Sequence, residues 1–285
     1  MVQEKNTLII GASGKTGSRI AKRLFELKKP FVAAGRHLQL NSDESINIYF
    51  DWYEESTHLS VLKNVDQIYL VAPVGDLEPA KVMIPFIEKA LAQGVKRFVL
   101  LSSASISEEG PAFGPVHLAL KKLAPEWTVL RPSFFMQNFT QVPHVETINM
   151  QNLIISATGQ GKIGFVDARD IAEVGVRALI DVKPHNTEHI ITGPDALTYK
   201  EVGQIIGRVA GRQIKHQSIT DKEFIMKWVD AGFSKDYAKF MTGIDRRIRE
   251  KGAESQVTDT IWQVTGRYPI SFKQFVEHHE NAWVK

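Results

Sequence analysis

Residues 7–17 read TLIIGASGKTG, a short apolar run that passes directly into a turn with three evenly spaced glycines. The apolar run predicts a buried strand, and the residues that follow the turn show the apolar spacing of a helix. Glycines at these places permit a tight exit from the strand, a close backbone approach to a ligand and close packing of helix on strand. The free N–H groups that begin such a helix attract phosphates. We therefore predict a dinucleotide-binding turn made by Gly11, Ser13, Gly14, Lys15, Thr16 and Gly17, the alternative being a tight turn without a ligand.

Strand-length apolar runs and helical segments alternate through the first half of the chain. This order is typical of an α/β fold, a doubly wound parallel sheet whose ligands lie at the carboxyl ends of the strands. The predicted strands are 7–10, 31–34, 46–50, 67–71, 97–101 and 128–130, with helices at 16–27 and 79–93. Further helices are expected at 170–179, 199–210, 221–252 and 272–283, and a short strand at 190–192. We expect a dinucleotide-binding domain at 1–185, including a substrate loop at 131–150, and a smaller, mostly helical substrate lobe at 186–285 packed on it.

Composition limits the classes of function. The formal charge of +3 is small and the basic residues are interspersed with acidic ones, which argues against a nucleic-acid partner. There is no cysteine, so disulfides and thiolate chemistry are excluded, and the nine histidines show no metal-ligand spacing. No signal peptide precedes the first strand, and no apolar run approaches the roughly 20 residues that span a bilayer. We expect a cytoplasmic protein without a metal or membrane partner, of unknown oligomeric state.

The residue that ends the second strand bears on the choice of cofactor. NAD-binding proteins usually place a carboxylate on the ribose about 20 residues after the glycine turn, whereas Arg36 stands here. Its guanidinium, with Lys15 nearby, suits a 2′-phosphate and favours NADP(H) over NAD(H), the alternative being a solvated arginine. Asp51 and Trp52 end the third strand and are placed beside the adenine, although Asp51 is equally suited to capping a helix. The other predicted cofactor residues follow the fourth and fifth strands: Ala72, Pro73 and Ser102.

Ser103 occupies the place where short-chain dehydrogenases carry their catalytic serine. Those enzymes add a tyrosine and a lysine spaced YxxxK, in which the lysine lowers the pKa of the tyrosine. Here His117 and Lys121 have that spacing on a predicted helix, which puts them on one face. We predict Ser103, His117 and Lys121 as catalytic candidates, with His117 as a proton donor or a polar anchor. An ordinary surface histidine and lysine are the equal alternative.

The segment 131–139, RPSFFMQNF, leaves the last predicted sheet strand with three phenylalanines and a methionine. A flexible apolar loop of this kind suits a flat hydrophobic substrate. The predicted substrate residues are Phe134, Phe135, Met136 and Asn138, and core packing by the same side chains is the alternative.

Taken together, these motifs resemble the NmrA-like, atypical short-chain dehydrogenase/reductases. The resemblance rests on GASGKTG, FDW, LLSSASI, GPVH, LRPSFFMQNF and GKIGFVDARDIAEV, and it continues through ITGPDALTY, AGRQI, DYAKFM and VTGRYPISF. Within this family the chain is similar to the festuclavine and agroclavine dehydrogenase group of ergot alkaloid synthesis and its bacterial relatives.

The resemblance implies an NADPH-dependent reductase that delivers hydride to an electron-poor carbon, an iminium in the alkaloid branch. Hydride addition to an iminium cation needs no proton donor, which would explain the missing tyrosine. Ser103, His117 and the loop Phe134–Asn138 would then shape the pocket. The expected substrate is a small hydrophobic imine, quinone or enone, and Lys121 leaves a carbonyl open. A non-catalytic sensor of the dinucleotide is the alternative function, because the family includes such proteins.

Overall fold

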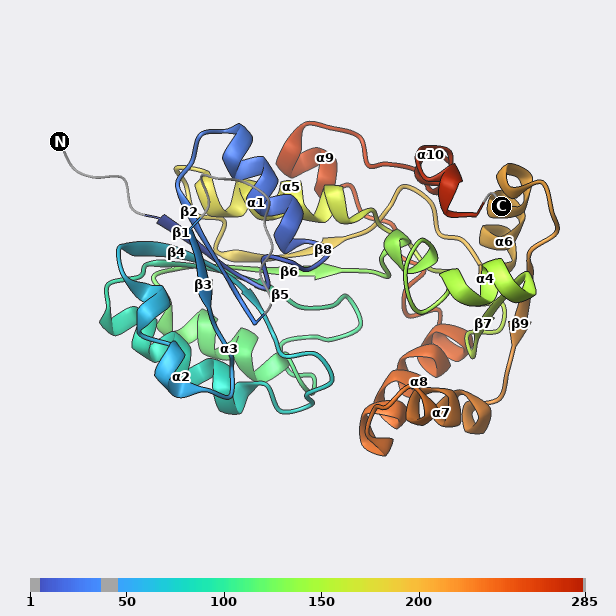
Figure 1. Cartoon of the computed structure of the whole chain (residues 1–285), viewed down its shortest axis with the longest axis horizontal. Helices are drawn as coiled ribbons and strands as arrows, with labels where there is room; N and C mark the ends of the chain where they lie inside the picture. Colours follow the sequence, from blue (N-terminus) through green and yellow to red (C-terminus); the bar gives the residue numbers. More distant parts are fainter. Residues whose placement is uncertain (1–5, 37–45, 284–285) are drawn as a thin grey trace. The chain divides into compact units, whose positions relative to one another are not determined.

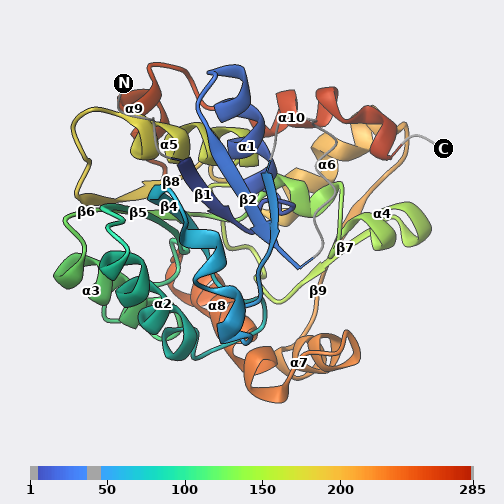
Figure 2. The ribbon, with the colours of Figure 1, turned by 60° about the vertical axis from the view of Figure 1, so that its left-hand side comes forward.

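The computed structural model describes residues 6–36 and 46–283, which fall into two compact units (Figures 1 and 2). The first unit runs to Arg131 and resumes at Ile171–Ile190, while the second comprises Pro132–Asp170 and the chain from Ile191 onward. This division differs from the boundary predicted at residue 185. The segment 132–170, which holds most of the predicted substrate loop, groups with the C-terminal residues because it packs into their core.

A seven-stranded sheet forms the centre of the first unit, in the order β3-β2-β1-β4-β5-β6-β8. The pairs β1–β2, β1–β4, β2–β3, β4–β5 and β5–β6 are all parallel, so the carboxyl ends of these strands meet at one edge. We call this edge the carboxyl edge. The strands are β1 (Asn6–Ile10), β2 (Phe31–Gly35), β3 (Ile46–Tyr49), β4 (Val65–Val71), β5 (Arg97–Leu101), β6 (Glu126–Pro132) and β8 (Thr187–Ile191).

Helices cover both faces of this sheet, as the doubly wound prediction requires (Figures 1 and 2). One face carries α1 (Gly17–Glu26) and α5 (Ala168–Ile180), and the other carries α2 (Ala80–Ala92) and α3 (Gly114–Leu123). Gly175 lets α5 approach closely, since a Cβ there would lie 3.2 Å from both Ile20 and Leu130. Two short 3-10 turns, η1 (Glu55–Thr57) and η2 (Ser60–Leu62), connect β3 to β4.

The second unit has a separate core. Its two-stranded parallel sheet pairs β7 (Leu153–Ser156) with β9 (Lys215–Ser218). Phe139 lies at the centre of the core, with its ring 5.2 to 5.9 Å from those of Phe165, Tyr199 and Phe272. The remaining elements are η3 (Met136–Phe139), α4 (Val145–Gln151), α6 (Tyr199–Ala210), α7 (Asp221–Asp230), α8 (Lys235–Lys251), α9 (Thr260–Thr265), α10 (Phe272–His278) and η4 (Glu280–Ala282).

Two general features concern function. Across 6–36 and 46–283, no helix is both long and apolar enough to cross a membrane. Over the same ranges, no group of three or more histidine, aspartate and glutamate side chains is placed to hold a metal ion.

Candidate functional site

The glycine turn between β1 and α1 depends on the absence of side chains. Gly11 has a φ of +76°, a left-handed conformation that favours glycine. A Cβ on Gly17 would lie 2.2 Å from the carbonyl oxygen of Gly11, a distance that no residue other than glycine tolerates. A Cβ on Gly14 would lie 3.1 Å from the same oxygen, which accepts the Gly14 N–H at 2.9 Å. The backbone therefore folds tightly on itself at the start of α1, as a phosphate-binding turn requires.

The predicted residues of this turn divide into anchors and exposed groups. Thr16 is 3% exposed, and its hydroxyl accepts a 2.8 Å hydrogen bond from the buried Tyr69 of β4. Its side chain thus ties the turn to the sheet rather than facing a ligand. Ser13 and Gly14 are exposed, and Gly11 and Lys15 are half-buried, so these four keep accessible surface. Burial and the nearby Arg19 lower the pKa of Lys15.

Arg36 directly follows β2 and is exposed at the carboxyl edge. Burial raises the pKa of both Tyr49 and Tyr53, and the charge of Arg36 opposes that shift in each. No carboxylate stands at the end of β2, since the strand closes with Ala34-Gly35. The end of β2 therefore carries the positive charge expected for a 2′-phosphate.

The structure places the residues after β3 unequally. The Asp51 carboxylate accepts the N–H of Tyr53 at 2.9 Å and so stabilises the turn that follows the strand. Trp52 is only 8% exposed, and its indole N–H donates to the carbonyl of Val71 at 3.0 Å, which joins the ends of β3 and β4. Its ring packs edge-on against Phe50 in the core. Trp52 therefore contributes little surface to the place predicted for the adenine.

Tyr53 was missed by the sequence reasoning. Its side chain is 65% exposed, and its hydroxyl donates a 2.8 Å hydrogen bond to Asp76 in the loop after β4. Burial of the hydroxyl and this hydrogen bond raise the pKa of Tyr53. The pair therefore bridges the loops that follow β3 and β4, next to Ala72 and Pro73. The sequence did offer one signal for Tyr53, because it directly follows Asp51 and Trp52, the two residues predicted to lie beside the adenine.

Ser102 and Ser103 directly follow β5 at the carboxyl edge, and the buried Arg131 binds the backbone of this loop. Ser102 donates its N–H to Leu130 of β6 at 2.8 Å. Arg131, 8% exposed, donates to the carbonyls of Ser103 at 3.4 Å and Ala104 at 3.0 Å, and forms an ion pair with Glu188 at 2.7 Å. The loop after β5 is thus fixed to β6 and β8 by one guanidinium.

His117 and Lys121 line one pocket of about 570 Å³ in the first unit, together with Arg131 and Glu188. His117 is 2% exposed, and its Nδ1 lies 3.7 Å from the Glu188 carboxylate. Burial lowers the pKa of His117 in spite of this carboxylate, which favours the neutral imidazole. The Lys121 ammonium forms an ion pair with Glu108 at 2.9 Å.

This pocket brings the predicted helical pair together but does not include Ser102 or Ser103 among its lining residues. Arg131 links the two groups, because it contacts the Ser103 carbonyl on one side and Glu188 on the other. Within residues 6–36 and 46–283, no hydrogen bond or ion pair joins either serine to His117, or His117 to Lys121.

The predicted substrate residues lie in the second unit and are not equally accessible. Met136 is 1% exposed within the core, so for this residue the core alternative is correct and the substrate role is not supported. The segment is also no flexible loop, because the N–H of Met136 and the carbonyl of Phe134 pair with the backbone of Val166. Phe134, Phe135 and Asn138 are half-buried and keep some exposed surface.

The observed turn fits a dinucleotide. A close backbone loop that a Cβ would fill, exposed residues at Ser13 and Gly14 just before a helix, and a cation at the end of β2 are the parts that suit a pyrophosphate and a ribose phosphate. Gly11, Ser13, Gly14, Lys15 and Arg36 would hold it.

Comparison with known proteins agrees with this geometry. The model of the NmrA-like family matches residues 3–264. The chain is 46% identical to the uncharacterized oxidoreductase YesF of Bacillus subtilis, with 99% of this chain and 98% of that protein covered. It is 38% identical to agroclavine dehydrogenase of Claviceps fusiformis, over 97% and 98% of the two chains.

Solved structures show the same fold. The NADPH complex of a quinone oxidoreductase from Escherichia coli has a TM-score of 0.80 at 20% identity and covers 95% of this chain and 99% of that one. The NADP(H) complex of triphenylmethane reductase from Citrobacter has a TM-score of 0.77 at 20% identity, with 96% and 99% covered. The predicted doubly wound fold and the predicted oxidoreductase class are confirmed, and the chain belongs to the NmrA-like family.

Proposed function

We propose that this protein is an NADPH-dependent reductase that delivers hydride to a small, flat, hydrophobic imine or iminium, quinone or enone. The observation that carries the proposal is the glycine turn at the carboxyl edge. Its backbone folds so tightly that residue 17 has no room for a Cβ, and Arg36 follows the neighbouring strand β2. Relatives named agroclavine dehydrogenase and festuclavine synthase support a reduction of this class.

The preference for NADPH rests on charge. A 2′-phosphate carries up to two negative charges, and the exposed guanidinium of Arg36 is the group that suits it. Lys15 adds a second cation at the neighbouring strand end. Structures of the same fold that hold NADPH or NADP(H) support this choice.

The bound cofactor would supply hydride, and the residues of the chain would supply position. The amides of the turn would hold the pyrophosphate, and Arg131 would keep the Ser102–Ser103 backbone fixed at the carboxyl edge. His117 would act as a polar anchor, because Glu188 faces its Nδ1 and burial lowers its pKa, which favours the neutral form. Lys121 would hold Glu108. Phe134, Phe135 and Asn138 are proposed as substrate contacts.

Such a site favours acceptors that need no proton from the protein. An iminium becomes a neutral amine when it accepts hydride, and a quinone or enone gives an anion that water can protonate. The ordinary tyrosine donor is replaced here by a neutral histidine. Simple ketones, which require a proton at the developing alkoxide, should be poor substrates.

The test is a panel of cyclic iminium ions, quinones, enones and ketones, with NADPH consumption followed by its absorbance. NADPH deuterated at C4 should pass deuterium to the carbon of an iminium, enone or ketone product, which separates hydride transfer from background oxidation; a hydroquinone would lose the label to water. We expect turnover of iminium, quinone or enone compounds at least tenfold faster than of ketones.

The rival function is a non-catalytic sensor of the dinucleotide, favoured by the missing tyrosine and by the engagement of Lys121 with Glu108. Tight NADPH binding without turnover of any compound in the panel would replace the enzyme proposal with this one. Absence of NADPH binding would reject both.

A further inference from the structure

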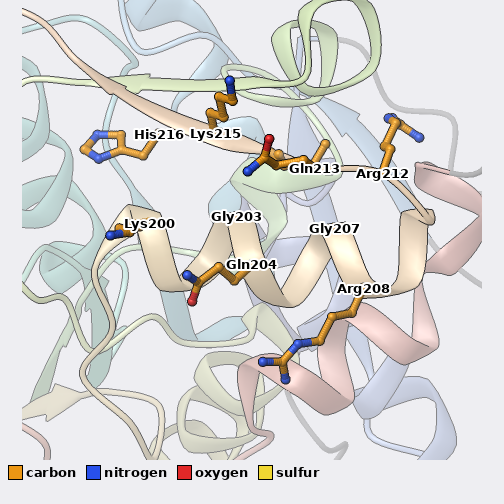
Figure 3. Close-up of a pocket in the computed structure, with 10 residues that line it drawn as sticks. Lys200, Gly203, Gln204, Gly207, Arg208, Arg212, Gln213, Lys215 and His216 are labelled. Carbon is orange, nitrogen blue, oxygen red and sulfur yellow. The ribbon is translucent and has the colours of Figure 1, made fainter.

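The second unit contains a groove of about 620 Å³ where α6 crosses the chain that leads into β9 (Figure 3). Two glycines on one face of α6 create it. A Cβ on Gly203 would lie 2.8 Å from the carbonyl oxygen of Ile214, and a Cβ on Gly207 would lie 2.7 Å from that of Arg212. The bare helix face lets the two backbones cross closely, and side chains from both sides border the resulting groove, which we call the α6–β9 groove.

Its lining is strongly cationic. Lys200 and Arg208 come from α6, Arg212 and Lys215 come from the crossing segment, and no aspartate or glutamate lines the groove. Lys200, Arg208 and Lys215 are exposed, and none of them forms an ion pair with another residue of 6–36 or 46–283. Four positive charges without a local counter-charge repel one another, which an anionic ligand would relieve.

Arg212 is fixed in place, and among residues 6–36 and 46–283 no carboxylate forms an ion pair with it. Its Nε donates to the side-chain oxygen of Asn152 at 2.7 Å, one terminal nitrogen donates to that of Asn149 at 3.1 Å, and the other donates to the carbonyl of Trp283. All three partners are neutral oxygens. The guanidinium is therefore held at one end of the groove with its full positive charge.

His216 lines the other end of the groove and is held in place by two neighbours. His216 lies 2.9 Å from the Ser156 hydroxyl through Nε2 and stacks on Tyr199, and its burial lowers the pKa of the imidazole. Figure 3 shows Gln213 over the helix, with Lys200 and Arg208 towards opposite ends of α6. Eight residues of helix separate these two by about 12 Å along the axis.

We propose that the α6–β9 groove binds a small molecule that carries two or more phosphate groups. The volume lies in the range of small-molecule sites, and cations spread along the groove suit several phosphates better than one. Gln204 and Gln213 provide amide donors between them. The proposal is independent of the reductase function, because the glycine turn of the cofactor belongs to the first unit.

The experiment is calorimetric titration of the full-length protein with tripolyphosphate at low and at moderate salt. The test variant is K200A/R208A/K215A, and the matched control is K63A/K122A/K183A, which removes the same charge from exposed positions away from the groove. We expect the groove variant to lose at least tenfold in affinity and the control to stay within twofold of the unmodified protein. No binding to the unmodified protein, or equal losses in both variants, would overturn the proposal.

Further arms test the class of ligand. Citrate should bind at least tenfold more weakly than tripolyphosphate, and so should a short single-stranded oligonucleotide per molecule. Equal or tighter binding of either would overturn the phosphate-bearing small molecule. The more conservative R212K variant, with its fold checked by circular dichroism, should also weaken tripolyphosphate binding. NADPH affinity of the groove variant should be unchanged, so failure here is distinguishable from failure of the reductase proposal.

Discussion

At the residue scale, single backbone carbonyl oxygens determine which side chain fits at one position of the site and which way another side chain points. The carbonyl oxygen of Gly11 sits where a side chain on residue 17 would begin, and the carbonyl of Val71 receives the indole of Trp52. The sequence predicted the glycine requirement correctly, because the spacing of the turn is local. It could not predict that the Trp52 ring faces the core, since that depends on an acceptor 19 residues away.

A Gly17→Ala substitution should therefore destabilise the first unit and weaken NADPH binding at least tenfold, because the added methyl group displaces the turn. Gly243 of α8 is a matched control, since a Cβ there meets nothing within 4 Å. Gly243→Ala should raise the free energy of unfolding by about 0.5–1 kcal/mol through helix propensity. Urea unfolding and fluorescence titration of NADPH measure both effects. Retained NADPH affinity in Gly17→Ala would contradict the close approach.

Arg36→Ala should weaken NADPH much more than NADH. A charge-assisted hydrogen bond contributes about 1.5–3 kcal/mol, which corresponds to roughly a ten- to hundredfold loss for the phosphorylated cofactor. Arg36→Lys, which keeps the charge without the planar fork, should lie between. Dissociation constants for the two cofactors in each variant provide the measurement. Equal losses for NADPH and NADH would remove Arg36 from the 2′-phosphate site.

At the scale of elements, the apolar strands of the large sheet were predicted, whereas both strands of the small sheet, the apolar β7 and the polar β9, were missed. The strand β5 was predicted with its bounds exact, and α6 likewise, because apolar spacing and end signals agree there. The strand β9 reads Lys215-His216-Gln217-Ser218 and has no apolar alternation, so only its pairing with β7 reveals it. The ion pair between Lys121 and Glu108 could not be predicted either, because it joins a helix to a loop whose position in space does not follow from the sequence.

The helix α8 carries a buried acid whose ionisation works against folding. Asp245 is 4% exposed and accepts the N–H of Ala157 at 2.9 Å. Burial raises its pKa to about 6, although that hydrogen bond and Arg249 oppose the shift. Because the unfolded carboxyl ionises first, this residue lowers the free energy of unfolding as the pH rises from about 4 to about 6.

Asp245→Asn should therefore be more stable than the unmodified protein at pH 7, by up to about 3 kcal/mol, with the advantage vanishing near pH 4. The amide oxygen keeps the bond from Ala157. Denaturant unfolding at several pH values tests this, with the exposed Asp195→Asn as the control. A pH-independent difference between Asp245→Asn and the unmodified protein would show that packing, rather than ionisation, is responsible.

At the scale of the whole molecule, the chain leaves the first unit at Arg131 and returns to it at Ile171. The returning segment is fastened by Arg97 at the start of β5. This guanidinium forms an ion pair with Glu126 at 2.5 Å and donates to the carbonyls of Leu179 at 2.7 Å and Asp181 at 2.6 Å. The sequence predicted the strands and helices involved but not this discontinuous division, because the exchange of segments is visible only in long-range contacts.

Arg97→Ala should lower the free energy of unfolding by about 2–4 kcal/mol, because it leaves a carboxylate and two carbonyls without their buried donor. Removing the exposed Lys81–Glu78 pair by Lys81→Ala should cost less than about 1 kcal/mol. Comparison of the two in urea unfolding checks the difference. Similar small losses in both variants would mean that the returning segment is held by its apolar contacts alone.

The discontinuity also bears on how the protein is made. During synthesis, the ribosome releases residues 6–131 well before β8 and most of α5 exist, so Arg97 and Arg131 emerge without the carbonyls and the Glu188 carboxylate that complete them. The first unit cannot close until residue 190 has left the exit tunnel. The nascent chain must therefore carry an unfinished sheet edge at β6 through the translation of some sixty residues, a window in which a chaperone that shields open edges would have its greatest effect on yield.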